Sequence, residues 1–338
     1  MRKNNQFSWE KIRHKDLGGV ILLRCKTVSS SKINLEVGIA PSLGSNMFRF
    51  RFRGTDLVHC DTRVLAKHDF TGNFVMWPFP NRVREKKWRW RGKEYSLERV
   101  VTPRGDFPLI HGLVRDRMWN FSEPKVSGDA VSFKTFVEMD RQSPYFDCYP
   151  FPSRLTLEYT LSASFVRVDY EVINLGKCEM PFGFALHPLF STSLSGEDLT
   201  LVTLPASFVM EMEGDLLPTG RRLKLSNVMY GMFNLNNPHP VRDLQLDHVY
   251  TGLSRKQPAV IDHKRQKVRI KIYASQDFTH CVLYTMQREK FICVEHQTCS
   301  TDAHNLHARG CVEEAHLLTV APGRSHKGFV VYAVEKYA

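Results

Sequence analysis

Apolar and polar residues alternate with a period of two along most of this chain, and no other sequence feature constrains its fold as strongly. The clearest run extends from Phe165 to Asn174, where every second residue from Val166 to Val172 is apolar. One face of such a segment is apolar and the other is polar, which is typical of a half-buried antiparallel strand.

The same pattern recurs along the rest of the sequence. It predicts strands at 33–39, 47–52, 131–139, 155–161, 268–273, 281–286 and 328–334. Turn signals separate them at 103–106, 236–238 and 321–323. Helical periodicity of useful length is absent except for a short turn near 302–306, and the βαβ rhythm of a parallel sheet is also absent. The expected fold class is therefore all-β, in the form of a β-sandwich.

The length of the chain allows one large domain or two of medium size, with a sizeable core in either case. We find no linker rich in glycine and serine, no low-complexity tract and no repeat of fixed period, so one large domain over 1–338 is the simplest prediction. The longest apolar runs fall far short of the ~20 residues that a membrane helix requires. No membrane partner is expected.

The eight cysteines are scattered and form no C-x-x-C pair. Cys281 and Cys293 lie inside apolar segments with strand patterns, which is typical of buried, reduced thiols. Cysteine usage of this kind favours a cytoplasmic protein.

The net charge of +12 raises the question of an anionic partner. Much of the charge lies in 82–93, where basic residues alternate with Trp88 and Trp90, and in the F-R-F-R-F-R run of 48–53. Basic and aromatic residues together are typical of a nucleic-acid platform. Strict alternation instead favours strands with one solvated basic face and one buried aromatic face, so we expect no nucleic-acid partner. An anionic small-molecule substrate stays open as a third interpretation.

The segment 181–191, with the sequence P-F-G-F-A-L-H-P-L-F-S, contains the first candidate for chemistry. It follows the strand predicted at 165–174, and we expect the chain to return through an apolar strand that ends on His187. Pro188 has no backbone N–H for a sheet ladder, which favours a strand end at that point. His187 is either a general acid in a cleft floored by the sheet or a core histidine with its hydrogen bonds satisfied.

Four more polar sites stand in apolar surroundings. They are Asn81–Arg82 after W-P-F-P, His111 before a glycine, Asp247 at a bend, and Glu295 directly after the apolar run 291–294. Each has a structural explanation of its own, such as a turn cap, an ion pair or a bond to a carbonyl. That explanation is weakest for Glu295, because its neighbours hold the backbone against the core. A partly dry surrounding tends to raise the pKa of a carboxyl towards that of a base.

Taken together, these two histidines, two acids, one arginine and one asparagine suit acid–base chemistry on a neutral, polyhydroxylated ligand. The sequence contains no serine elbow, phosphate loop or dinucleotide-binding fingerprint. His304 and His307 offer two imidazoles without an evident third ligand, so a zinc site is not expected. We expect no metal and no other cofactor.

Several motifs occur in one order along the chain: P-F-P-N-R-V, G-K-E-Y-S-L, H-G, V-I-N-L-G, M-P-F-G-F-A-L-H-P-L-F, L-D-H-V-Y-T-G-L, V-E-H-Q-T, D-A-H-N and A-P-G-R-S. In these motifs the chain resembles the aldose 1-epimerases, or mutarotases, of the galactose-mutarotase-like superfamily. The resemblance covers roughly residues 30 to 335. It implies a large, twisted, antiparallel β-sandwich (the supersandwich of that superfamily) with the site in an open cleft on one sheet.

The resemblance also implies a role for each candidate. Glu295 would be the general base and His187 the general acid, and His111 would assist at the ring oxygen or the neighbouring hydroxyls. The residues implied to orient the sugar are Asn81, Arg82 and Asp247. Paired proton transfers open and close the ring without a cofactor. A nearby carboxylate is expected to keep His187 protonated near neutral pH.

Two departures from the family pattern leave the identity of the sugar open. After H-G the chain reads L-V-R-D-R-M-W-N in place of a second glycine, and H-P-L-F replaces the usual H-P-Y-F. The favoured function is a mutarotase acting on a free hexose. The alternatives are a hexose-6-phosphate 1-epimerase, with Arg84, Arg115 or Arg117 holding the phosphate, and a non-catalytic carbohydrate-binding protein.

Overall fold

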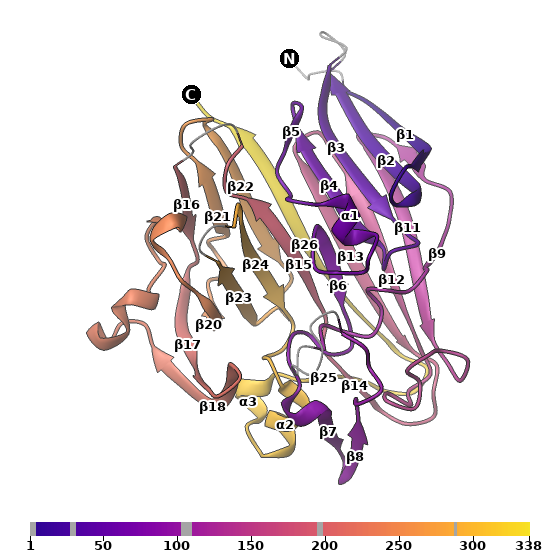
Figure 1. Cartoon of the computed structure of the whole chain (residues 1–338), viewed down its shortest axis with the longest axis vertical. Helices are drawn as coiled ribbons and strands as arrows, with labels where there is room; N and C mark the ends of the chain where they lie inside the picture. The colour runs from indigo at the N-terminus through magenta and orange to yellow at the C-terminus, as the bar shows by residue number, and fades with distance from the viewer. Residues whose placement is uncertain (1–4, 28–31, 103–109, 195–198, 287–288) are drawn as a thin grey trace.

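The computed structural model describes residues 5–27, 32–102, 110–194, 199–286 and 289–338. Within these residues the strands form three large sheets and two short pairs, and the paired strands are antiparallel, as the alternation predicted. Figure 1 shows the sheets stacked in layers, with both chain termini at the same end of the molecule. The turn predicted at 103–106 lies outside the described residues.

The N-terminal sheet contains five strands that pair in chain order. They are β1 (Asn5–His14), β2 (Gly18–Thr27), β3 (Ile33–Ala40), β4 (Asn46–Phe52) and β5 (Thr55–Asp56). The strands predicted at 33–39 and 47–52 are thereby confirmed as β3 and β4.

A ten-stranded sheet lies behind it and contains the long alternating segments of the sequence. Its order is β10 (Lys125–Ser127), β11 (Ala130–Met139), β12 (Ser153–Leu161), β13 (Phe165–Asn174), β26 (Ser325–Lys336), β22 (Val268–Ala274), β21 (Ala259–His263), β16 (Thr200–Thr203) and β19 (His239–Pro240), with β9 (Asn120–Phe121) paired to β11. In β13 burial alternates strictly along all ten residues. The last strand, β26, lies between β13 and β22 and therefore joins the early and late parts of the chain.

The third sheet has seven strands. Its order is β18 (Leu217–Lys224), β17 (Ala206–Glu213), β20 (Asp247–Leu253), β23 (His280–Thr285), β24 (Phe291–Gln297), β15 (Ala185–Ser191) and β6 (Asn73–Met76). The short pairs are β14 (Met180–Phe182) with β25 (Leu318–Val320), and β7 (Lys87–Trp90) with β8 (Lys93–Ser96). The short helices are α1 (Thr62–Leu65), α2 (Ala303–Ala308) and α3 (Val312–Ala315), and the 3₁₀ turns are η1 (Arg84–Lys86), η2 (Val228–Phe233) and η3 (Val241–Asp243).

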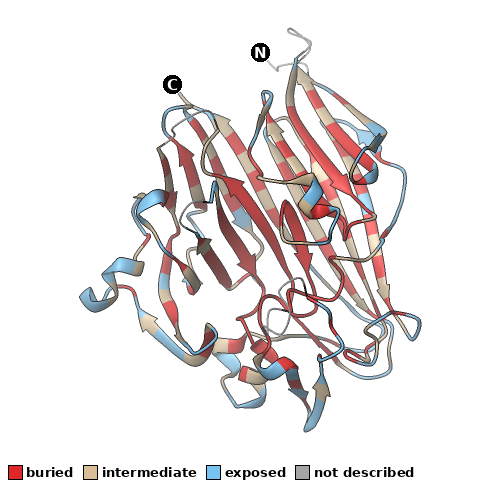
Figure 2. Cartoon of the chain, viewed as in Figure 1, coloured by how far each residue is buried: buried red, intermediate tan, exposed pale blue. Residues whose placement is uncertain are grey.

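One continuous apolar core joins the three large sheets. Phe50 of β4, Phe190 of β15 and Tyr332 of β26 belong to it. The Tyr332 ring contacts both others, at 5.6 Å from Phe190 and 6.5 Å from Phe50 between ring centroids. Figure 2 shows the buried residues concentrated along the facing strands. The seven-stranded sheet thus turns one face to this core, which leaves its other face available for a binding site.

The segment around His187 differs from expectation in two ways. Strand β15 does not end at His187 but continues to Ser191, and Pro188 lies between the paired positions Ala185↔Gln297 and Leu189↔Cys293. The proline therefore lies at a gap in the ladder with β24, where no backbone N–H is needed, and strand β15 continues through it. In addition, β15 does not pair with β13, because the chain crosses through β14 to the other sheet.

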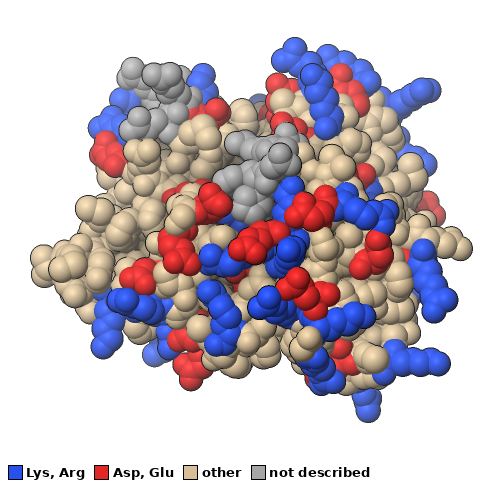
Figure 3. Space-filling view, turned by 60° about the horizontal axis from the view of Figure 1, so that its bottom comes forward, with Lys and Arg blue, Asp and Glu red and all other residues tan. Residues whose placement is uncertain are grey.

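Within the basic run at 82–93, strand β7 has one solvated basic face, as the alternation predicted, whereas Arg82 and Lys86 are buried outside this strand. In β7, Trp88 and Trp90 are buried while Lys87 and Arg89 are exposed. Arg89 is paired with Glu94 at 2.8 Å. On the face of the molecule that Figure 3 draws, acidic groups are interspersed among the basic ones. Local pairing of this kind dilutes the positive field that a nucleic acid would require.

Two further expectations concern thiols and membranes. All eight cysteines are free, and Cys281 and Cys293 are buried, as predicted. Over the described part of the chain, no helix has the length and apolar character needed to span a bilayer.

Candidate active site

A cavity of about 780 Å³ opens on the face of the seven-stranded sheet that is turned away from the core. All six residues singled out in the sequence line it. The lining comprises His59, Asp61, Val64, Phe70, Thr71, Asn81, Arg82, His111, His187, Leu189, Asp247, Val282, Tyr284, Met286, Glu289, Phe291 and Glu295. Its volume lies within the range of small-molecule sites. Residues spread over more than half of the chain therefore meet in one place.

His187 and Glu295 form the floor of this cavity. Contrary to expectation, Glu295 lies inside β24 and not after its end. His187 lies opposite Glu295 on β15, midway between the positions that pair with β24. The Nε2 atom of His187 is 3.1 Å from Oε1 of Glu295, and the carboxyl side chain is only 1% exposed. Gln297 donates to the other carboxyl oxygen at 3.1 Å, and Phe74 stacks on the imidazole at 4.3 Å between ring centroids.

Burial displaces the two pKa values in opposite directions. Desolvation, together with the nearby charge of Asp247, raises the pKa of Glu295 well above its usual value, against smaller opposing effects of Gln297 and Arg82. Desolvation lowers the pKa of His187 to about 3, and the charge of Arg82 acts in the same direction. The expectation that His187 stays protonated near neutral pH is therefore wrong, because desolvation outweighs the carboxyl group. Burial therefore favours the neutral form of both groups.

His111 lies beside this pair on a strained turn. Both His111 and Gly112 have left-handed backbone angles, with φ of 50° and 80°. A Cβ atom on Gly112 would lie 2.6 Å from the backbone nitrogen of Trp77, so only glycine fits there. The imidazole of His111 is 5.3 Å from that of His187 between ring centroids. Burial lowers its pKa well below the usual value, and it is neutral at physiological pH.

Arg82 connects the two sides of the cavity. It donates to the Asn81 side chain at 3.0 Å and to the carboxylate of Asp247 at 2.9 Å. The guanidinium is buried, whereas the Asp247 side chain keeps 24% exposure. These three groups lie around the His187–Glu295 pair with donors and acceptors fixed in place, which suits the orientation of hydroxyl groups.

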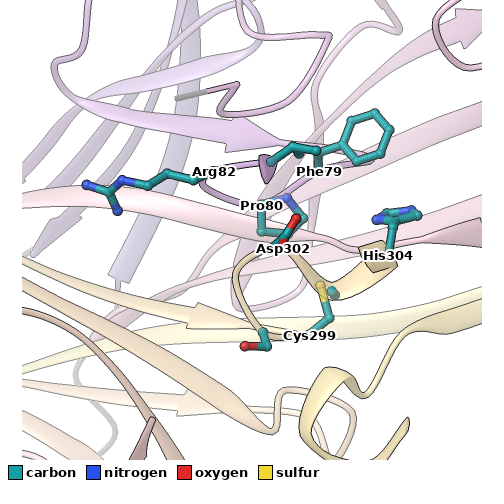
Figure 4. A pocket seen from close by; sticks show the side chains of 9 residues that line it. Phe79, Pro80, Arg82, Cys299, Asp302 and His304 are labelled. Carbon is teal, nitrogen blue, oxygen red and sulfur yellow. The ribbon is translucent and has the colours of Figure 1, made fainter. Parts of the chain in front are cut away.

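Asp302 holds the loop that carries Arg82, and sequence reasoning did not assign it a role. Its backbone N–H donates to the Arg82 carbonyl at 3.1 Å, and its carboxylate accepts from the backbone N–H of Arg84 at 3.0 Å and from Asn305 at 2.7 Å. Figure 4 shows Asp302 and His304 beneath the loop from Phe79 to Arg82, with the Arg82 side chain pointing away from both. Asp302 belongs to the D-A-H-N motif of the sequence, but the motif does not identify the partners of Asp302, which are distant in sequence.

None of the three arginines suggested for phosphate binding is among the described residues that line the cavity. Arg84 pairs with Glu213 at 2.9 Å, and Arg117 donates to the Glu138 carbonyl at 2.7 Å. Arg115 donates to the His68 carbonyl and lies over the Phe70 ring. Each guanidinium therefore has a structural partner inside the protein.

One group of three metal-binding side chains occurs among the residues described by the structure. The ligand atoms of His187, Cys293 and Glu295 all lie within 4.8 Å of one another. His304, for which the sequence offered no third ligand, packs its ring against Phe79 and Trp88.

Comparison with known proteins agrees with this architecture. The family model described as aldose 1-epimerase matches residues 34–337. An uncharacterised Escherichia coli protein, YihR, is 24% identical over 291 residues, which cover 85% of this chain and 87% of that protein.

Among solved structures, a galactose mutarotase-like protein from Clostridium acetobutylicum has a TM-score of 0.83 at 18% identity, covering 98% of this chain and 99% of its own. A galactose 1-epimerase from Lactobacillus acidophilus has a TM-score of 0.77 at 15% identity, covering 99% and 100%. These likenesses show the shared β-sandwich fold. With the family model spanning most of its length, this chain belongs to the aldose 1-epimerase family.

Proposed function

We propose that this protein is an aldose 1-epimerase that interconverts the α and β anomers of a free hexose. The observation that carries the proposal is the pair of His187 and Glu295, held 3.1 Å apart at the floor of a sugar-sized cavity. The two oxygens that exchange protons in ring opening, O1 and O5, are both bonded to C1. Their proton donor and acceptor must therefore be close neighbours, as these two groups are.

The pair carries one proton, which both steps of the reaction can use. Transfer from Glu295 to Nε2 of His187 produces a carboxylate and an imidazolium. Glu295 then takes the proton of the O1 hydroxyl while His187 gives its proton to O5, and the C1–O5 bond breaks to the open aldehyde. Rotation about C1–C2 and the reverse transfers close the other anomer. Protons balance throughout, so no co-reactant is consumed.

The other lining residues support this chemistry. The neutral imidazole of His111 assists at the ring oxygen or a neighbouring hydroxyl, because it both donates and accepts hydrogen bonds. The Arg82 guanidinium, bonded to Asn81 and Asp247, orients the remaining hydroxyls. Binding alone would not require a buried acid and base in contact, which disfavours a non-catalytic carbohydrate-binding protein.

The charge of the cavity wall favours an unphosphorylated sugar. Apart from the His187–Glu295 pair, which shares one proton, the described lining residues include three acids, Asp61, Asp247 and Glu289. Arg82 is the one guanidinium among the described lining residues and already bonds to Asp247. A phosphate dianion would meet like charges there without a guanidinium fork of its own. A hexose-6-phosphate 1-epimerase is therefore the second candidate.

Anomer exchange measured by NMR across free and 6-phosphorylated hexoses tests the proposal. Wild-type protein should accelerate exchange of a free hexose, and Glu295→Gln should reduce the rate by about 10²-fold or more, the scale of a lost general base. Circular dichroism and urea unfolding of the variant serve as the folding control. A folded Glu295→Gln protein with an unchanged rate would remove the catalytic proposal.

Ionic strength separates the two substrate classes. For a free hexose, kcat/KM should change little between low and high salt, because neutral hydroxyls are not screened. A phosphorylated hexose that reacts faster than its free counterpart at low salt, and loses that advantage at high salt, would favour the second candidate.

A further inference from the structure

Cys293 lies next to the catalytic pair, and the proposed reaction gives its thiol no task. It precedes Glu295 by two residues on β24 and therefore faces the same side of the sheet. Its cross-strand neighbours are Leu189 on β15 and Tyr284 on β23, both of which line the cavity. The Cys293 side chain itself is fully buried beneath that lining.

We propose that His187, Cys293 and Glu295 form a site for a thiophilic divalent cation such as Zn²⁺, and that the ion inhibits the enzyme when it binds. Their ligand atoms, an imidazole nitrogen, a sulfur and a carboxylate oxygen, all lie within 4.8 Å of one another. In a tetrahedral zinc site, bond lengths of about 2.0–2.3 Å place ligand atoms roughly 3.3–3.8 Å apart. The imidazole and carboxyl are already 3.1 Å apart, so small side-chain movements suffice.

The composition of the site determines which ions it selects. Sulfur, imidazole nitrogen and carboxylate oxygen together favour Zn²⁺ and related transition metals, whereas Mg²⁺ and Ca²⁺ prefer oxygen ligands alone. His187 offers Nε2, the ring atom that faces Glu295, as the nitrogen ligand. Three protein ligands leave the fourth tetrahedral position for water on the cavity side.

Inhibition follows from the identity of the ligands. A metal ion at this site would occupy the nitrogen of His187 and the carboxylate of Glu295, the two atoms between which the proton moves. Neither group could then exchange a proton with the sugar. This consequence rests on the proposed function, whereas binding of the metal does not.

Cobalt provides a binding readout that is independent of activity. Intact protein titrated with Co²⁺ under anaerobic conditions should develop a near-ultraviolet thiolate-to-cobalt charge-transfer band that saturates at one equivalent, and Zn²⁺ should abolish it. Cys293→Ala should lose the band. Cys281→Ala is the matched control, because Cys281 is equally buried on the neighbouring strand β23 but belongs to the main core on the opposite face. The control should keep the band.

Glu295→Gln is the second variant in case Cys293→Ala does not fold. It preserves side-chain volume, removes the anionic ligand and should weaken cobalt binding at least about 10-fold, as ligand-shell changes at metal sites do. Absence of the band in wild-type protein at saturating Co²⁺ would overturn the proposal. A band of equal intensity in folded Cys293→Ala would do so as well.

The kinetic arm compares each protein with its own metal-free rate. Zn²⁺ should suppress anomer exchange in wild type and in Cys281→Ala, with recovery on adding a chelator, and should suppress it at least about 10-fold less effectively in Cys293→Ala. Exchange activity without a cobalt band would refute the metal site and leave the proposed function intact. A cobalt band in a protein without exchange activity would support the site and refute the function.

Discussion

Individual ionisable groups at the cavity floor set the pH range in which the proposed reaction runs. The catalytic pair is competent when it holds one proton in total. Burial places the loss of that proton at the raised pKa of Glu295, and the gain of a second at the lowered pKa of His187, about 3. Between these limits the protonation state of the pair does not change.

The pH profile of anomer exchange should therefore be flat through the weakly acidic range and should fall on the alkaline side, because Glu295 loses the shared proton there. On the acid side the rate should fall only as the pH approaches about 3, where His187 takes up a second proton. NMR exchange rates from pH 4 upwards, with the spontaneous rate subtracted, provide the measurement. A rate that rises through the ordinary carboxyl range of about 4–5 would contradict this assignment.

Asp247 gives a second residue-level prediction. Its negative charge is the largest electrostatic cause, after desolvation, of the raised pKa of Glu295. Asp247→Asn should therefore lower that pKa and move the alkaline limb to lower pH, and it should also raise KM because Arg82 loses its partner. Asp61→Asn, which alters another acid of the cavity wall, should leave the limb in place. If both variants shifted the alkaline limb of the pH–rate profile equally, the general charge of the cavity, and not Asp247 in particular, would determine its position.

At the scale of strands and loops, alternation in the sequence predicted eight of the 26 strands that the structure describes, but not how they pair. Alternation assigns each residue to a face, so β3, β4, β11, β12, β13, β22, β23 and β26 were all predictable. A period of two carries no information on which strand pairs with which, and for that reason β15 was wrongly joined to β13. Polar residues 295–297 suggested the end of a strand, yet β24 continues because these residues pair with β23.

The six site candidates could be selected because they interrupt apolar surroundings in a recognisable order. Asp302, Phe74 and Cys293 could not be selected in this way. Phe74 and Cys293 look like ordinary strand residues, and their contact with the catalytic pair depends on cross-strand register. The partner of Asp302 is a loop more than 200 positions earlier. Such relationships are tertiary, and local patterns do not encode them.

The loop held by Asp302 gives the prediction at this scale. Asp302→Ala removes the buried acceptor of the Arg84 N–H, which should cost about 1–3 kcal/mol of unfolding free energy. The looser loop should raise KM more than it lowers kcat, because Arg82 orients the sugar and does not transfer protons. Asp302→Asn, which keeps an oxygen acceptor, should recover most of both losses.

Urea unfolding and steady-state kinetics test this pair of variants, with Asp243→Ala as a control at a solvent-exposed acid. A loss of kcat with unchanged KM in Asp302→Ala would assign Asp302 a different role from the one argued here.

For the whole molecule, the dependence of folding stability on pH is set by the number of buried imidazoles more than by any single one. Desolvation lowers the pKa of five buried histidines: to about 3 for His187, His280 and His304, to about 4 for His296, and well below its usual value for His111. These histidines thus stay unprotonated in the folded protein at pH values below about 6.5, at which they are protonated in the unfolded chain. Their contribution to stability is present above that pH and is lost as the pH falls towards the folded values.

Stability should therefore fall steeply between pH 6.5 and 4.5. Each histidine contributes a slope of about 1.4 kcal/mol per pH unit once its unfolded form is charged. Glu295 and Asp302, whose pKa values burial raises, reduce the total slope, since the folded state holds their protons. Urea unfolding at several pH values measures the net slope of stability against pH. His304→Gln should reduce this slope by the contribution of one histidine. Constant stability from pH 6.5 to 5 would refute this picture.

The cross-strand arrangement of His187 and Glu295 has a consequence for how this architecture can change over evolution or by engineering. Their spacing is set by the ladder between the neighbouring strands β15 and β24, while other lining residues, such as His59, Arg82 and His111, come from separate segments. Insertions or exchanges in those segments reshape the cavity without shifting the ladder. Selectivity for a new sugar can therefore be changed by exchanging one lining segment at a time for that of a relative, while the proton-transfer pair stays as it is.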